Sequence, residues 1–262
     1  LSAVIFWTVF RFSNVLGYSS NDAKWWSIAF LFASPLIWIV LSPKYGYLPY
    51  EFSVLFTLLA LLEYLGKKRW WLVGFLSALT FLTRPTAGLV IIFFALELFF
   101  SQDKDKKRSL FLLILPIIIA GFLLGGYNYL RFGGFLEQGY SYQMVSNESL
   151  EQARSYGLLR PTHVPGNLYY LLFAAPQPGF RDTISPVLTF PYIKADPWGM
   201  SFVFVSPYLL LLFLLRKLDN TDRHLLFASF LISLPLLLYY GIGFVQVGYR
   251  YGLDFFPLIF FL

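Results

Sequence analysis

The sequence predicts an all-α fold, a polytopic bundle of about nine transmembrane helices with one long extracytoplasmic loop at 128–198. Hydrophobic residues make up 58% of the chain, and charged residues only 13%, against about 25% in soluble domains. The apolar residues are gathered into runs that short charged or Gly- and Pro-rich stretches separate, as membrane spans require. The segment 128–198 is the longest one between two such runs.

The expected spans follow the apolar runs in chain order. They cover 1–17, 25–41, 51–65, 70–83, 86–100, 109–127, 201–215, 225–247 and 249–262. The first and last are expected to be incomplete, because Leu1 already stands inside an apolar run and the last run holds about 14 residues, fewer than the roughly 20 that cross a bilayer. We therefore expect part of a longer protein.

The expected organisation is one integral membrane domain in three parts. N-terminal transmembrane helices occupy 1–127, the extracytoplasmic loop 128–198, and C-terminal transmembrane helices 199–262.

Short basic connections at 67–69, 104–108 and 216–223 set the expected orientation, since short loops rich in Lys and Arg mark the cytoplasmic side. The connections 67–69 and 104–108 lie on the same side of the membrane only if the stretch 70–100 crosses the membrane twice. We therefore expect a break at Thr83-Arg84-Pro85, where proline interrupts a helix. The 128–198 loop then lies outside, with a short interfacial helix at 167–174.

Several kinds of site are not expected. Cysteine is absent, and His163 and His224 are far apart in the sequence, which argues against thiol chemistry and a zinc site. The net charge of +6 comes from basic residues beside apolar runs, which indicates topology signals and not nucleic acid. No cofactor is indicated, and the scattered outer carboxylates leave a need for a divalent cation open.

Arg84 stands between two apolar runs at an outer helix end, where an arginine is costly unless it meets an anion or a carboxylate. It is predicted either to bind phosphate, whose oxygens match the guanidinium fork, or to anchor the helix end at the interface. Arg250 and Asp254 are four residues apart, on one face of a helix. They are expected to form a structural ion pair or, with Tyr251, a polar site at the outer mouth.

Glu51 begins a span beside a loop that contains three tyrosines. Its carboxylate is predicted to act as a general base or cation ligand, or simply to face the N-terminal dipole of its helix. Glu63 and Glu97 lie near basic connections and are expected to be surface charges. Arg131 and Tyr140 stand at the beginning of the long loop.

Four stretches, in order, resemble the GT-C glycosyltransferases, specifically the bacterial membrane enzymes related to protein O-mannosyltransferases and to the lipid A aminoarabinose transferase. They are 74–88 (GFLSALTFLTRPTAG), 127–140 (YNYLRFGGFLEQGY), 197–207 (PWGMSFVFVSP) and 248–257 (GYRYGLDFFP). The resemblance implies transfer of a sugar from a polyprenyl-phosphate-linked donor to a glycan, lipid or protein acceptor. The expected place is the outer face of a bacterial-type plasma membrane.

Such a transfer needs a carboxylate to deprotonate the acceptor hydroxyl and cations to stabilise the leaving phosphate. Carried over from the resemblance, Arg84 and Arg250 would contact the phosphate, and Arg131 and Tyr140 would border the cavity. The family's key acidic residue lies in the first outer loop, which would precede Leu1. Glu51 is then the remaining candidate base, and this stretch alone is expected to be inactive.

Two other functions fit the pattern: a lipid-linked polysaccharide polymerase or ligase, and a transporter or flippase of lipid-linked intermediates. A transporter should show polar or broken helices at the bilayer midplane, whereas the ionisable residues here gather near the outer edge. The transferase hypothesis predicts that Arg84, Arg250 and the start of the 128–198 loop converge on one outward-facing cavity.

Overall fold

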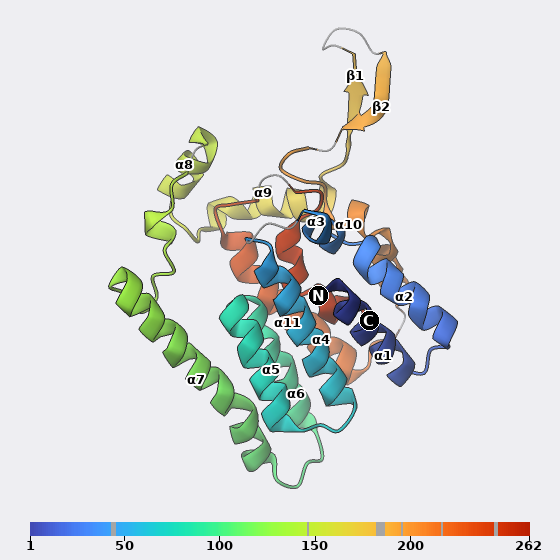
Figure 1. Ribbon diagram of the computed structural model, residues 1–262, viewed down its shortest axis with the longest axis vertical. Helices are drawn as coiled ribbons and strands as arrows, with labels where there is room; N and C mark the ends of the chain where they lie inside the picture. Colours follow the sequence, from blue (N-terminus) through green and yellow to red (C-terminus); the bar gives the residue numbers. More distant parts are fainter. Residues whose placement is uncertain (43–45, 146, 182–186, 195, 216, 244–245) are drawn as a thin grey trace.

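The computed structural model describes residues 1–262 apart from 43–45, 146, 182–186, 195, 216 and 244–245 (Figure 1). Arg216 of the third basic connection thus lies outside the described residues. The α-helices are α1 (Ser2–Val15), α2 (Ser20–Phe32), α3 (Leu36–Leu41), α4 (Leu48–Leu65), α5 (Trp70–Thr83), α6 (Ile91–Phe100), α7 (Lys106–Phe132), α8 (Glu148–Ser155), α9 (Val164–Leu168), α10 (Phe202–Val205), α11 (Asn220–Leu238) and α12 (Phe256–Ile259). Short 3₁₀ or π turns are η1 (Ala87–Val90), η2 (Tyr140–Tyr142), η3 (Pro161–His163), η4 (Tyr169–Phe173), η5 (Pro207–Leu214) and η6 (Arg250–Asp254). The strands β1 (Gln177–Phe180) and β2 (Leu188–Lys194) pair antiparallel.

The expected all-α bundle of about nine spans is wrong in two respects. The 128–198 segment contains the two-stranded sheet β1–β2. Among the described residues, only α4, α7 and α11 are both long and apolar enough to cross a membrane, by length and composition. These three helices are compatible with a membrane protein.

The other apolar runs fold into helices that are too short to be spans. The helices α1, α2 and α5 contain 14, 13 and 14 residues, which at 1.5 Å per residue gives about 20 Å, against a hydrocarbon core of about 30 Å. The run at 201–215 is divided at Ser206 into α10 and η5, and the last run into η6 and α12. Composition alone did not reveal these interruptions.

The predicted break between the fourth and fifth runs is confirmed. The helix α5 ends at Thr83, and Arg84 adopts an extended backbone, as expected for a residue before proline. The chain then turns through η1 into α6. The turn is tight, because a Cβ on Gly88 would lie 2.5 Å from the Cβ of Phe81, and only glycine avoids that overlap.

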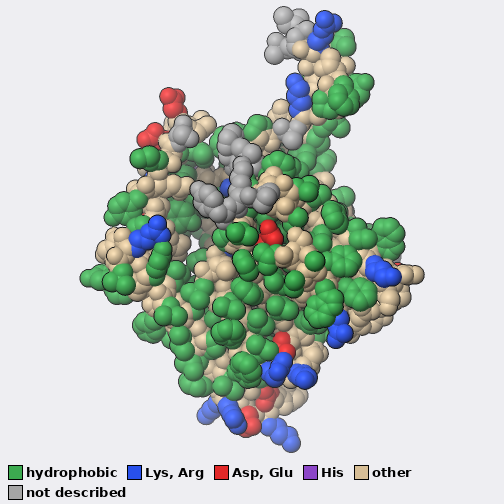
Figure 2. Space-filling view, viewed as in Figure 1, with side chains coloured by type: hydrophobic (Ala, Val, Ile, Leu, Met, Phe, Trp, Pro, Cys, Tyr) green, Lys and Arg blue, Asp and Glu red, His purple; other side chains and the backbone are tan. Residues whose placement is uncertain are grey.

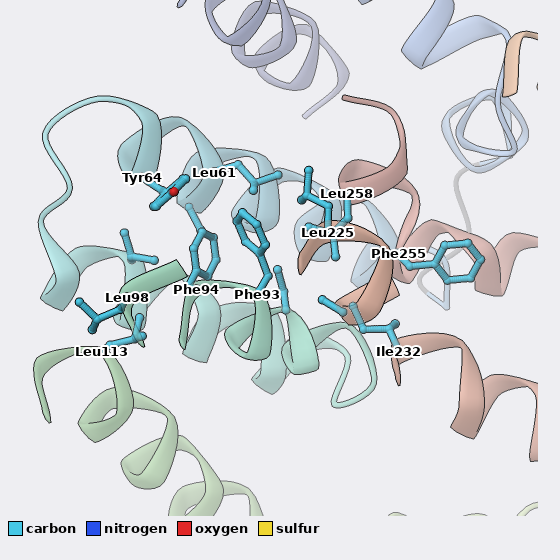
Figure 3. Close-up of a cluster of buried hydrophobic side chains, with 14 of the residues drawn as sticks. Leu61, Tyr64, Phe93, Phe94, Leu98, Leu113, Leu225, Ile232, Phe255 and Leu258 are labelled. Atoms are coloured by element: carbon cyan, nitrogen blue, oxygen red, sulfur yellow. The ribbon is translucent and has the colours of Figure 1, made fainter. Parts of the chain in front are cut away.

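A cluster of buried hydrophobic side chains holds the central helices together. Figure 3 shows Phe93 and Phe94 of α6 among residues from α4, α7, α11 and the segment 255–258. The helices α5 and α7 also approach closely, since a Cβ on Gly74 would lie 2.3 Å from the carbonyl oxygen of Leu113. A second cluster packs α1 and α2 against α4 and α12. The same cluster packs the start of α4 against Leu253 of η6.

The described surface is strongly apolar along the helices. Exposed side chains on α7 include Ile118, Ile119, Phe122 and Leu123, all between 47% and 78% exposed. In Figure 2, hydrophobic side chains cover much of the visible face, and Lys and Arg gather at its lower end. The connections 67–69 and 104–108 lie at that end in Figure 1.

The segment 128–198 is partly helical, as expected. The helix predicted at 167–174 is present, although it starts earlier, as α9 and η4 at 164–173. The hairpin β1–β2 projects away from the helices (Figure 1). It carries exposed apolar side chains, including Phe190, Tyr192 and Ile193.

Candidate functional site

A cavity of about 560 Å³ opens at the end of α4 and α5 that lies opposite the basic connections. It is bordered by the start of α4, the break between α5 and η1, the beginning of the 128–198 segment, the end of α11, and η6. The lining residues are Gly46, Pro49, Tyr50, Thr83, Arg84, Pro85, Thr86, Leu136, Gln138, Tyr140, Leu158, Leu159, Pro235, Leu236, Tyr239, Arg250 and Tyr251. Of the predicted site residues, four therefore lie around one cavity: Arg84, Tyr140, Arg250 and Tyr251.

Arg84 is held on several sides. Its Nη2 donates to Asp254 Oδ2 over 2.8 Å, and its Nε donates to Asp254 Oδ1, so the contact is bidentate. The Thr86 hydroxyl donates to the same carboxylate. The guanidinium carbon lies 3.8 Å from the ring centre of Tyr50, a distance typical of a cation–π contact. Asp254 is 1% exposed, so this buried carboxylate is matched by a cation and a hydroxyl.

Arg250 is the first residue of η6. Its guanidinium carbon lies 5.5 Å from the ring centre of Tyr47 and 5.2 Å from that of Tyr251. Its Nη1 donates to Gln246 Oε1 over 3.3 Å. The prediction of an ion pair between Arg250 and Asp254 is wrong. These two residues begin and end a 3₁₀ turn, and the Asp254 carboxylate pairs with Arg84 instead.

Tyrosines form the polar part of the opposite wall. The rings of Tyr140 and Tyr239 are 5.7 Å apart, and those of Tyr239 and Tyr251 are 5.9 Å apart. Burial raises the pKa of Tyr140 above its ordinary value, and burial followed by the neighbouring Tyr251 does the same for the pKa of Tyr239. Both hydroxyls are therefore neutral at physiological pH and can donate hydrogen bonds to an anion.

Glu51 and Arg131 do not line the cavity. Glu51 is 9% exposed in the first turn of α4, where its carboxylate suits the helix dipole. Arg131 is exposed near the end of α7, and its guanidinium carbon lies 5.8 Å from the ring centre of Tyr127. It borders a shallower neighbouring hollow, which also includes Gln138 and Tyr140.

The sequence did not single out several residues that complete the site. Tyr50 precedes Glu51, a predicted site residue, and Thr86 follows Pro85, where the helix break was predicted. These neighbouring positions were the only indication that the sequence offered for the two residues. Nothing in the sequence pattern pointed to Tyr239, because its contact with Tyr140 depends on where α11 ends in the folded chain. Gln246, which touches Arg250, was placed inside the expected span 225–247 and was not singled out, whereas in the structure it lies beyond the end of α11.

A second polar cluster lies at the other end of the helices. Glu97 of α6 accepts hydrogen bonds from Tyr64 of α4 and Thr221 of α11, and its Oε1 lies 2.6 Å from His224 Nδ1. The Glu97 side chain is only 10% exposed. The expectation that Glu97 is a surface charge is therefore wrong. Glu63 pairs with Arg69, whose side chain is 46% exposed, but the Glu63 side chain is only 12% exposed, so it too is partly buried.

Comparison of the chain with models of known protein families, with curated proteins and with solved structures finds no match. Among the described residues, groups of three or more His, Cys, Asp or Glu that could hold a metal ion are absent.

Proposed function

We propose that the cavity receives the phosphate and the first part of the hydrocarbon tail of a polyprenyl-phosphate-linked sugar, for transfer of that sugar to an acceptor at the outer face of a membrane. One observation carries this proposal: two arginines open on a cavity whose remaining wall is largely apolar. The apolar side is formed by Leu136, Leu158, Leu159, Pro235 and Leu236. A ligand that suits both walls has an anionic head and a hydrocarbon tail.

The proposed orientation follows from charge. The helices α4 and α5 each have one end at the cavity and the other at the basic connection 67–69. If that connection lies in the cytoplasm, the cavity and the 128–198 segment lie outside. The chain is then a multi-pass membrane protein in which α4, α7 and α11 cross the bilayer. Because α7 ends at the outer side and α11 begins at the cytoplasmic side, the chain also returns through the membrane between these two helices.

In the proposed reaction, the acceptor hydroxyl loses its proton to a base, and its oxygen attacks the anomeric carbon of the sugar. The bond between that carbon and the phosphate oxygen breaks, and the electron pair leaves with the phosphate. Cationic and hydroxyl donors in the cavity stabilise the charge that develops on the departing oxygen. The described lining residues include neither Asp nor Glu, Glu51 included, so they do not supply the base.

Sugar transfer can be tested with a labelled polyprenyl-phosphate sugar and membranes that contain the complete gene product. We expect transfer by the wild type and loss of at least about tenfold in Leu159→Trp, because the added ring volume fills the apolar side of the cavity. Leu159 is 56% exposed, so the substitution does not disturb a closed core.

The matched control is Leu130→Trp, on α7 and outside the cavity lining, at a leucine that is 87% exposed. Its transfer rate should equal that of the wild type. Wild-type membranes that transfer no sugar, or equal rates in Leu159→Trp and the control, contradict the proposal.

A further inference from the structure

A second pocket, of about 630 Å³, opens at the end of the helices away from the cavity. It lies between the end of α4, the start of α5, the end of α6 and the start of α11, beside the cluster around Glu97. We propose that this second pocket binds the head group of a zwitterionic phospholipid, whose primary ammonium contacts Asp103 and whose phosphate contacts Lys68. The proposal goes beyond sugar transfer and requires only that the long apolar helices cross a membrane.

The second pocket contains two charges of opposite sign that do not pair with each other. Lys68 and Asp103 both line it, and the three ion pairs among the described residues involve neither of them. The Lys68 ammonium nitrogen lies 5.0 Å from the ring centre of Tyr64, so the ring orients the ammonium at the pocket wall. Both side chains can therefore meet charges that a ligand brings.

Asp103 is charged at physiological pH. The backbone N–H of Asp105 donates to its Oδ1 and the Ser109 hydroxyl donates to its Oδ2, both over 2.8 Å. These hydrogen bonds lower the pKa of Asp103 below its ordinary value. A ligand ammonium can share the same oxygens, because each carboxylate oxygen accepts more than one hydrogen bond.

The other carboxylate of the second pocket, Glu97, is already engaged by the protein. It accepts hydrogen bonds from Tyr64 and Thr221, and its Oε1 lies 2.6 Å from His224 Nδ1. The charges that remain for a ligand are one ammonium and one carboxylate. They match a head group that itself carries a phosphate and an ammonium.

Exposed aromatic side chains beside the second pocket favour a lipid over a soluble zwitterion. Phe100 lines the pocket and is 62% exposed, and its neighbour Phe99 is 70% exposed. Trp71, which follows the lining residue Trp70, is exposed as well. Aromatic and basic residues mark the level of lipid head groups, and the basic connections lie at this end (Figures 1 and 2). A head group bound here can leave its acyl chains on the neighbouring apolar surface.

Binding can be measured as the rise in thermal midpoint of the purified complete gene product in detergent, titrated with short-chain phospholipids. Phosphatidylethanolamine should raise the midpoint by about 3 °C or more at saturation, because a ligand of the folded state stabilises it. Phosphatidylglycerol lacks the ammonium and phosphatidylcholine lacks its N–H groups, so both should bind at least about fivefold more weakly. O-Phosphoethanolamine and inorganic phosphate, at the lipid concentrations, should leave the midpoint unchanged.

Lys68→Gln and Asp103→Asn should each raise the Kd for phosphatidylethanolamine about fivefold, since each removes one charge contact at an open interface. The matched controls are Lys107→Gln and Asp105→Asn, which remove the same charges from exposed positions of the connection 104–108, outside the pocket lining. Their Kd should equal that of the wild type. Each Kd is taken from the shift relative to that variant's own lipid-free midpoint, so a loss of stability does not count as a loss of binding.

Several results would overturn the proposal. The absence of a shift with phosphatidylethanolamine rejects the site. Equal affinity for phosphatidylcholine or phosphatidylglycerol rejects the contact between the ammonium and Asp103. Saturation by O-phosphoethanolamine or inorganic phosphate at the lipid concentrations assigns the second pocket to a soluble ligand. Controls that lose as much affinity as the pocket variants show only a general attraction to the basic end. None of these results bears on sugar transfer, which the labelled donor tests separately.

Discussion

Individual glycines set how closely the central helices approach one another. Gly74 of α5 faces the backbone of α7 at Leu113, and Gly88 of η1 faces Phe81. Neither glycine has a positive φ, so their role is steric. At both places, the absence of a side chain allows the backbone of one element to touch the next.

Gly74→Ala should therefore lower the free energy of unfolding by about 1–3 kcal/mol, the usual cost of an overpacked contact. The added methyl group would meet a carbonyl oxygen, which cannot move without shifting α7. The measurement is chemical or thermal unfolding in detergent.

Gly121→Ala on α7 is the matched control, because nothing lies within 4 Å of the added Cβ. Alanine is the better helix former by about 1 kcal/mol, so this variant should be as stable as the wild type or slightly more so. Equal losses in the two variants would contradict close packing between α5 and α7.

At the scale of whole elements, the Glu97 cluster joins three helices at the end away from the cavity. Tyr64, Glu97 and Thr221 come from α4, α6 and α11, and His224 adds a second contact from α11. The first turn of α11 is further fixed by a capping box between Asp219 and Asp222.

Glu97→Ala should lower the free energy of unfolding by about 2 kcal/mol, because it removes the hydrogen bonds that Glu97 makes with the buried Tyr64 and the partly buried His224. Hydrogen exchange should increase in the first turns of α11. Asp105→Asn is a suitable control, since Asp105 is exposed and makes no side-chain capping bond. An unchanged stability in Glu97→Ala would show that the cluster does not hold the helices together.

The sequence predicts elements best where a local rule decides them. Pro85 forces the break after Arg84, and the long apolar run at 109–127 becomes α7. The hairpin was missed because its strands are short and exposed, without the alternation of a half-buried sheet. The residues of the cavity were found in part, since Arg84 and Arg250 are unusual beside apolar runs. Asp254 and Tyr251 were also named, but the pairing of Asp254 with Arg84 was missed, because it depends on tertiary packing between segments 170 residues apart.

At the scale of the whole molecule, the two ends of the helices differ in charge and chemistry. Basic connections lie at one end and the cavity at the other, with exposed apolar side chains of α7 between them. This is the arrangement that the positive-inside rule gives for an outward-facing site.

Single cysteines can test this orientation, because the sequence contains no cysteine of its own. Gln102→Cys lies just before the basic connection 104–108, between α6 and α7, and Gln152→Cys lies in α8, both at exposed positions. In intact cells, a membrane-impermeant maleimide should label Gln152→Cys and should label Gln102→Cys only after the cells are broken. Labelling of both positions in intact cells, or the reverse pattern, would contradict the proposed orientation.

The contact between Arg84 and Asp254 also sets an order of events during synthesis. Arg84 leaves the ribosome 170 residues before its partner, roughly 10 to 30 seconds at ordinary elongation rates. Throughout that interval the Arg84 guanidinium cannot form the ion pair that it makes in the folded chain. The cavity is therefore completed late, when the C-terminal segment brings Asp254 to Arg84.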